Sequence, residues 1–212
     1  KQSDKKVYFV FTIQLHKDDA PVLLRLRDHF NIGKVSLTLN RVTWICRNQN
    51  EARVLIDIFS KNPLNTTKHL NFLLWKEAFE LYTNRMGKSC SPELMTKVLA
   101  LKDEMNKKRT SFNMPTDHTI RITDYWFLGF AEGEGSFWIS VKKKTISKVG
   151  GTPNLVFQIN QHSRDANLIN SFVEYTPSTL RLEGAHNIYI YYVYGKAHRV
   201  DGSCCGKVIG SN

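Results

Sequence analysis

The stretch that decides the fold of this chain reads Trp126-Phe127-Leu128-Gly129-Phe130-Ala131-Glu132-Gly133-Glu134-Gly135-Ser136-Phe137. Gly129 and Gly133 lie four residues apart in an apolar run, although a glycine costs about 1 kcal/mol in a helix relative to alanine. The spacing predicts a helix whose two glycines let another helix approach closely. Glu132 and Glu134 point to nearly opposite sides of such a helix, so only one can face a shared site. The simpler alternative is a buried helix with a glycine-rich C-terminal cap.

The nine residues Phe127–Gly135, with the Ser-Phe and the alternating strand that follow, resemble the signature helix of the LAGLIDADG homing endonucleases. The resemblance implies that Glu134, the second acid of the motif, is catalytic and binds the metal ion together with Gly135. It also implies an α+β fold of two pseudo-symmetric halves, whose curved antiparallel sheets form a saddle with helices on the convex side. The expected cofactor is Mg²⁺ or another divalent cation, because a carboxylate is a hard oxygen ligand.

An internal repeat agrees with two halves. The segment Val10–Ala20 recurs as Val156–Ala166, and the constant offset from position 10 to position 156 is 146 residues. Such a long period indicates duplication of one supersecondary unit rather than a solenoid. The same offset puts the counterpart of Glu134 before Lys1 and the counterpart of Lys68 after Asn212, so the chain is expected to begin in the first strand of the first half. The predicted division is a first half at 1–83 without its motif helix, a basic helix and interhalf linker at 84–122, and a C-terminally incomplete second half at 123–212.

Hydrophobic periodicity predicts the remaining elements. Helices are expected at 21–30, 51–59, from Thr66 or Thr67 onward, from a start at Ser91-Pro92 through 95–109, from Thr123 or Asp124 to the motif, and at 167–175. Strands are expected at 7–16, 34–39, 42–47, 136–142, 155–161 and 187–194, with Phe137, Ile139 and Val141 facing inward. Residues 142–151 are predicted to form a turn, and 200–212 a frayed end.

Composition points to a polyanionic partner, because 30 Lys and Arg against 19 Asp and Glu give a net charge of +11. A merely soluble basic protein is the alternative. No apolar run reaches the roughly 18 residues that span a bilayer, so no membrane partner is expected. The four cysteines lack CxxC spacing and indicate free thiols in a reducing compartment; His186, His198, Cys204 and Cys205 do not have the spacing of a known zinc finger.

Strand alternation names the side chains that would read nucleic acid, since a curved antiparallel sheet can lie in the major groove. In the second half these are Ser136, Trp138, Ser140, Lys142, Gln158 and Asn160, and in the first half Thr12, Gln14, Ser36, Thr38, Arg41 and Arg47. Lys143 and Lys144 are expected to meet phosphates. The alternative for all of them is a solvated outer sheet face.

Three classes of function remain open. The first, implied by the resemblance, is a monomeric, organellar (mitochondrial) homing endonuclease that hydrolyses one long double-stranded DNA site, with Lys68 as a second catalytic residue. An exposed first-turn lysine is the alternative for Lys68. The second class is a degenerate, non-catalytic relative that binds intron RNA or ribosomal RNA, as a maturase or as a structural component of a ribonucleoprotein such as an organellar ribosome. The third is a protein-interaction module, which explains the charge but not the motif. With Glu134 as its one motif acid, the chain alone is not expected to cleave both strands.

Overall fold

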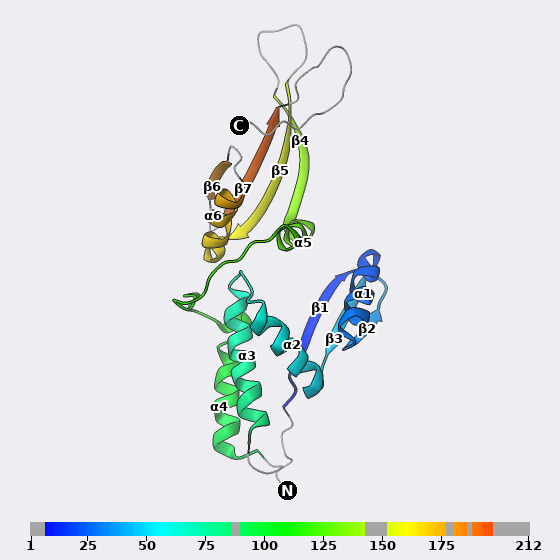
Figure 1. The fold of residues 1–212 in the computed structure, drawn as a ribbon, viewed down its shortest axis with the longest axis vertical. Helices are drawn as coiled ribbons and strands as arrows, with labels where there is room; N and C mark the ends of the chain where they lie inside the picture. Colours follow the sequence, from blue (N-terminus) through cyan, green and yellow to red (C-terminus); the bar gives the residue numbers. More distant parts are fainter. Residues whose placement is uncertain (1–6, 86–89, 143–151, 177–179, 186–187, 197–212) are drawn as a thin grey trace. The chain divides into compact units, whose positions relative to one another are not determined.

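The computed structural model describes residues 7–85, 90–142, 152–176, 180–185 and 188–196 (Figure 1). The chain forms two compact units. The first contains residues 1–64 and 68–114, and the second contains residues 65–67 and 115–212. The short segment 65–67 therefore belongs to the second unit although both its flanks belong to the first.

In its described residues, the first unit is a three-stranded antiparallel sheet with four α-helices. Its elements are β1 (Phe11–His16), α1 (Ala20–Phe30), β2 (Lys34–Leu37), β3 (Arg41–Cys46), α2 (Gln49–Lys61), α3 (Lys68–Thr83) and α4 (Pro92–Asp103), with short 3₁₀ turns at Lys17–Asp19 and Asn106–Lys108. The strand order is β1-β3-β2. The predicted helices and strands are thus present, with boundaries shifted by a few residues.

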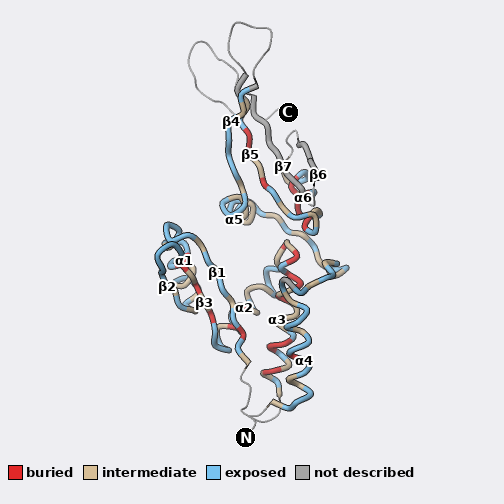
Figure 2. The backbone as a smooth tube through the Cα atoms, turned by 180° about the vertical axis from the view of Figure 1, so that it is seen from behind, coloured by how far each residue is buried: buried red, intermediate tan, exposed pale blue. Residues whose placement is uncertain are grey.

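Two apolar clusters hold this unit together. On one face of the sheet, the buried residues Val42, Trp44 and Cys46 pack with Leu23 of α1 and Leu55 of α2. A second cluster joins α2, α3 and α4 around Phe9, with members Phe9, Ala52, Ala78, Phe79, Tyr82 and Val98. Figure 2 shows the buried positions along β3 and α3 in red. Because Val98 is buried in this cluster, the predicted basic helix packs as part of the first unit.

The part of the second unit that the structure describes is a four-stranded antiparallel sheet with two α-helices. Its elements are α5 (Asp124–Glu134), β4 (Gly135–Lys142), β5 (Thr152–His162), a 3₁₀ turn (Ser163–Asp165), α6 (Ala166–Tyr175), β6 (Leu180–Ala185) and β7 (Ile188–Lys196), in the strand order β4-β5-β7-β6. Its core consists of Ile159 and three α6 residues, Leu168, Ile169 and Phe172, against which the aromatic residues of α5 pack. Helices and antiparallel sheets together confirm the predicted α+β class.

The repeat seen in the sequence is a structural repeat. His16 and His162 both precede a 3₁₀ turn with nearly the same backbone angles (φ −65°, ψ 153° and φ −65°, ψ 148°). In both, the ring Nδ1 accepts from the backbone N–H two residues later. A helix follows each turn at once, α1 in one unit and α6 in the other.

One prediction about the repeat was wrong. β1 corresponds to β5, which pairs with both β4 and β7, whereas β1 pairs only with β3 in the described part of the first unit. β1 is therefore the counterpart of the second strand of the second unit, not of its first strand.

The inward placement of the apolar residues of β4 was also wrong. Phe137, Ile139 and Val141 are 82%, 66% and 59% exposed. They share a face with Phe157 and Ile159, and the residues of α5 and α6 pack against that face at Phe157 and Ile159. In the first unit, Phe9, the counterpart of Leu155, is buried against aromatic residues of α3, while Leu155 is 42% exposed. Alternation identified the apolar face correctly but could not show whether described helices cover it. The expectations for 143–151 and 200–212, and the four zinc candidates, lie outside the described residues.

Candidate nucleic-acid interface and active site

The motif helix α5 buries one face and exposes the other. Thr123 caps it, with its hydroxyl accepting from the backbone N–H of Trp126 at 3.2 Å. Trp126, Phe127 and Phe130 all lie against the Phe172 ring, with centroid distances of 5.3–6.1 Å. The opposite face is an exposed stripe at helical spacing, which we call the small-residue stripe: Tyr125, Leu128, Gly129, Glu132 and Gly133.

No described residue packs against Gly129 or Gly133, so the expected packing of another helix there stays a prediction. A Cβ atom placed on either glycine would have no neighbouring atom within 4 Å. The aromatic residues on the other side of α5 are partly buried against α6.

Glu134 is exposed at the last position of α5, and among the described residues its carboxylate makes no hydrogen bond or ion pair. Gly135 follows at the junction with β4, where a Cβ atom would lie 2.5 Å from the Ala131 carbonyl oxygen and 2.9 Å from the Phe157 ring. The junction therefore requires glycine. The Glu134 carboxylate and the backbone carbonyl of the adjacent Gly135 are hard oxygen donors of the kind that suits Mg²⁺. Within the part of the chain that the structure describes, no cluster of three or more metal-ligating side chains completes the set.

Lys68 is the first residue of α3 and is exposed. It belongs to the first unit, whereas Glu134 belongs to the second. Its assignment as a catalytic residue stays a prediction.

In the first unit, the sheet face opposite the core is mostly polar, with Ile45 as an apolar member, and it is internally hydrogen-bonded. Strand register places Thr12, Gln14, Ser36 and Arg41 on this face, as alternation predicted. Arg41 donates from Nη1 to Gln14 Oε1 at 3.1 Å, and Gln14 donates from Nε2 to Thr43 Oγ1 at 3.2 Å.

The same register adds four residues that were not predicted, namely His16, Lys34, Thr43 and the half-buried Ile45. These residues could be found only from the cross-strand partners, which periodicity along a single strand does not give. Two predicted residues lie just outside the strands. Thr38 makes a turn in which its backbone N–H and hydroxyl both donate to the Arg41 carbonyl, and Arg47 follows β3.

In the second unit, Ser136 pairs with Gln158 and Ser140 with Asn154, so these four side chains share the outward face with Trp138 and Asn160. Gln158 donates from Nε2 to Asn160 Oδ1 at 2.7 Å. Trp138 is 45% exposed beside the buried Val156, with which it pairs. Asn154 was missed from sequence. Lys142 ends β4, and Lys143 and Lys144 lie outside the described residues.

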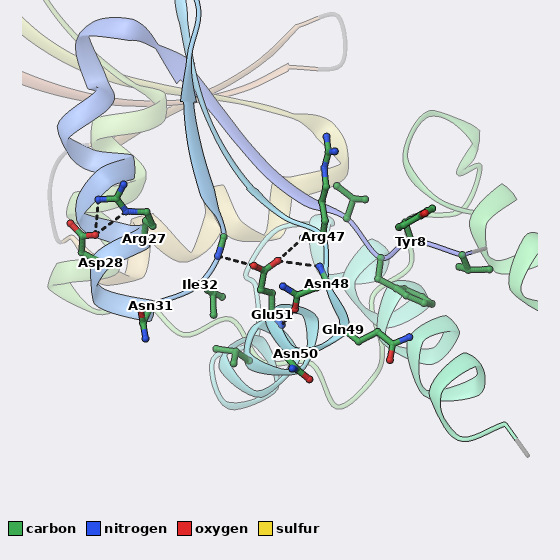
Figure 3. Close-up of a pocket in the computed structure, with 15 residues that line it drawn as sticks. Tyr8, Arg27, Asp28, Asn31, Ile32, Arg47, Asn48, Gln49, Asn50 and Glu51 are labelled. Carbon is green, nitrogen blue, oxygen red and sulfur yellow. Dashed lines mark hydrogen bonds and ion pairs between the residues drawn. The ribbon is translucent and has the colours of Figure 1, made fainter. Parts of the chain in front are cut away.

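A cleft of about 1300 Å³ lies at one end of the first sheet, lined in part by Tyr8, Arg27, Arg47 and Glu51 (Figure 3). Glu51 closes its inner wall by accepting three backbone N–H groups, from Gly33 at 3.2 Å, Arg47 at 2.7 Å and Asn48 at 3.1 Å. Burial alone would raise the pKa of the Glu51 carboxyl, but these hydrogen bonds outweigh it and lower the pKa. Because the Glu51 carboxylate already accepts three backbone hydrogen bonds, we interpret it as a structural residue rather than as a group that binds a ligand in the cleft.

Cys46 is buried beside Glu51, and Cys90 is half-buried; both thiols are free, as expected. Burial, with a smaller contribution from the charge of Glu51, raises the pKa of Cys46 to about 11. No helix in the described part of the chain is long and apolar enough to cross a membrane.

Comparison with known proteins gives a consistent result. The family model described as LAGLIDADG endonuclease matches residues 1–79 and 127–201. The uncharacterized mitochondrial protein RF1 of Saccharomyces cerevisiae is 27% identical over 184 residues, which cover 82% of this chain and 34% of that protein. Probable intron-encoded endonuclease 3 of Neurospora crassa is 28% identical over 181 residues, covering 78% of this chain and 33% of that protein.

The chain thus spans about one third of the length of these two relatives. Among solved structures, I-SmaMI bound to an uncleaved DNA target in the presence of calcium ions has a TM-score of 0.73 and 26% identity, and the match covers 88% of this chain and 68% of that one. The family model alone matches well over half of the residues. Its two matched segments lie in the N-terminal and C-terminal parts of the chain, and the second begins within the motif helix. The chain belongs to the LAGLIDADG endonuclease family.

Proposed function

We propose that this chain is part of a mitochondrial, intron-encoded homing endonuclease. It binds a long double-stranded DNA site and hydrolyses phosphodiester bonds there as a monomer. The observation that carries the proposal is the hydrogen-bonded row Arg41–Gln14–Thr43 on the outward face of the first sheet. Amide side chains suit adenine edges and guanidinium groups suit guanine edges, and the row holds both types in place before DNA arrives. The net charge of +11 favours the phosphate backbone.

The chemistry is centred on Glu134. Endonucleases of this family are in general divalent-metal dependent, and the free carboxylate of Glu134 with the Gly135 carbonyl would hold Mg²⁺ as the specific ion. When bound, the metal would activate a water molecule or offset the charge that develops on the scissile phosphate. Lys68 would add a positive charge near that phosphate. A second acid would come from a helix equivalent to α5, packed on the small-residue stripe, so that each acid serves one strand.

A single-stranded RNA is the second candidate partner, and one observation favours it. Trp138 is 45% exposed on the outward face of the second sheet, where an indole can stack on an unpaired base. On this reading the protein is a non-catalytic maturase or a ribonucleoprotein component.

The test compares Glu134→Gln with Glu132→Gln in the full-length protein. Each change removes one charge at constant size, but Glu132 lies on the small-residue stripe, whereas Glu134 ends the helix beside Gly135. With Mg²⁺ and a matched DNA site, Glu134→Gln should keep DNA binding and lose cleavage of at least one strand, and Glu132→Gln should be much milder. Normal cleavage by Glu134→Gln would remove Glu134 from the active site. A wild-type protein that never cuts DNA but binds intron RNA would favour the second candidate.

A further inference from the structure

A buried carboxylate in the second unit reaches a segment 98 residues earlier in the chain. Asp165 Oδ1 accepts from the backbone N–H of Thr67 at 2.6 Å, and its Oδ2 accepts from the Thr67 hydroxyl at 3.3 Å. Asp165 is 7% exposed and Thr67 is 6% exposed. A carboxylate this buried is stable only with donors around it, and besides Thr67 the half-exposed Arg164 lies 3.7 Å away.

Asn65 attaches the same segment at a second point. Its side-chain amide pairs in both directions with the backbone of Arg121, donating to the carbonyl at 2.7 Å and accepting from the N–H at 3.0 Å. Asn65 is 6% exposed. These bonds explain why residues 65–67 belong to the second unit although α3, which follows them, belongs to the first.

The residue that comes next is Lys68, the first residue of α3. The first N–H groups of a helix lack acceptors within it, and a negative charge is favourable there. Asp165 supplies both at Thr67, the residue directly before α3. We propose that Asp165 is a positioning residue for Lys68: it holds Thr67, the residue before Lys68, and so fixes the point in the second unit from which the Lys68 backbone continues. The inference rests on the proposed function, because it gives the Lys68 amine a part in cleavage.

The repeat supplies a matched residue without this contact. Asp19 occupies the place of Asp165, between a 3₁₀ turn and a helix with closely similar backbone angles. Asp19 is exposed, and among the described residues its carboxylate has no partner. Neither aspartate caps the helix that follows it. The local fold therefore does not need the Asp165 carboxylate, whose contacts are directed to Thr67.

The experiment uses the full-length protein with Asp165→Ala, Asp165→Asn and the control Asp19→Ala. A catalytic group that shifts by about 1 Å can cost roughly 100-fold in rate. With saturating DNA and Mg²⁺, Asp165→Ala should lower the single-turnover cleavage rate by roughly 10- to 100-fold. The dissociation constant for DNA should stay within about 3-fold, because no DNA-reading residue changes. Asp165→Asn should recover most of the rate, since its amide oxygen can still accept from Thr67, and Asp19→Ala should match wild type.

Amide hydrogen exchange at Thr67, measured without DNA, tests the contact independently of cleavage. Exchange should accelerate in Asp165→Ala and stay slow in Asp165→Asn and Asp19→Ala. Accelerated exchange with a wild-type cleavage rate would overturn the positioning role, and unchanged exchange would overturn the contact itself. If the wild-type protein never cuts DNA, the proposed function fails, and the role of Lys68 fails with it, while the exchange data still decide whether Asp165 holds Thr67. If Asp165→Ala does not fold, two other variants take its place in both measurements. Thr67→Val removes the hydroxyl bond to Asp165, and Asn65→Ala removes the two bonds to Arg121.

Discussion

At the scale of single residues, Glu51 joins two turns of the first unit. Asn48 and Glu51 form a capping box at the start of α2, and the same Glu51 carboxylate also accepts from Gly33 in the turn before β2. Gly33 has a φ of +77°, and a Cβ atom there would collide with the Trp44 indole nitrogen. The Glu51 side chain, the turn at Gly33 and the buried Trp44 thus depend on one another. A change at Glu51 should therefore affect both the turn at Gly33 and the start of α2.

Glu51→Ala should lower the free energy of unfolding by about 1–2 kcal/mol at pH 7, the usual range for a lost cap. The lowered pKa of Glu51 means that the folded protein holds this proton more weakly than the unfolded chain does. Its stabilisation is therefore complete above the ordinary pKa of 4.5 and is lost as the pH falls through the lowered folded value. Denaturant unfolding of wild type and variant from pH 7 to pH 2 checks this. A difference in stability that stays constant over that range would contradict it.

At the scale of elements, two glycines of the motif have different roles. Gly135 stands in a closed junction, where a methyl group would meet the Ala131 carbonyl and the Phe157 ring. Gly129 faces open space in the described chain. In this 212-residue chain, Gly135→Ala should destabilise the second unit by about 1–3 kcal/mol through overpacking. Gly129→Ala should stabilise it by up to about 1 kcal/mol through helix propensity.

Thermal unfolding of both variants checks the pair. If Gly129→Ala is destabilising in this chain, a partner already covers the small-residue stripe. The same change in the full-length protein, where a second motif helix is proposed to pack there, should reverse sign.

The sequence predicted elements well where local patterning decides them. Val10–Ala20 and its copy at Val156–Ala166 fold alike because alternation, a His-capped turn and a helix start are all encoded within the segment. Prediction from the sequence failed where the burial of a residue depends on residues far away in the chain. Phe137 has the pattern of a core residue and is 82% exposed. The outward face of the first sheet was only partly predicted, because Thr43 and Lys34 join it through cross-strand pairing that periodicity along one strand does not contain.

At the scale of the whole molecule, binding experiments should distinguish residues that contact phosphates from residues that read bases. The logarithm of the DNA association constant should fall linearly with the logarithm of salt concentration, by about 0.9 per phosphate contact. Lys34→Ala should weaken all DNA sequences alike and reduce that slope by about 1. Gln14→Ala, on the same sheet face, should leave the slope unchanged and alter sequence preference. Titrations of a matched and a scrambled DNA at several salt concentrations measure both effects, and identical behaviour of the two variants would contradict the division of roles.

The attachment of Thr67 to Asp165 also orders events during synthesis. The acceptor lies 98 residues downstream of the donor, and at about 5–20 residues per second a ribosome needs roughly 5–20 s to cover that distance. Once residue 114 has been synthesised, the first unit can collapse around Trp44 and Phe9, while the backbone N–H of Thr67 still has no acceptor. The nascent chain thus passes through a stage in which its N-terminal unit is formed but Lys68 is not yet anchored, and a ribosome that stalls before Asp165 leaves the protein at that stage.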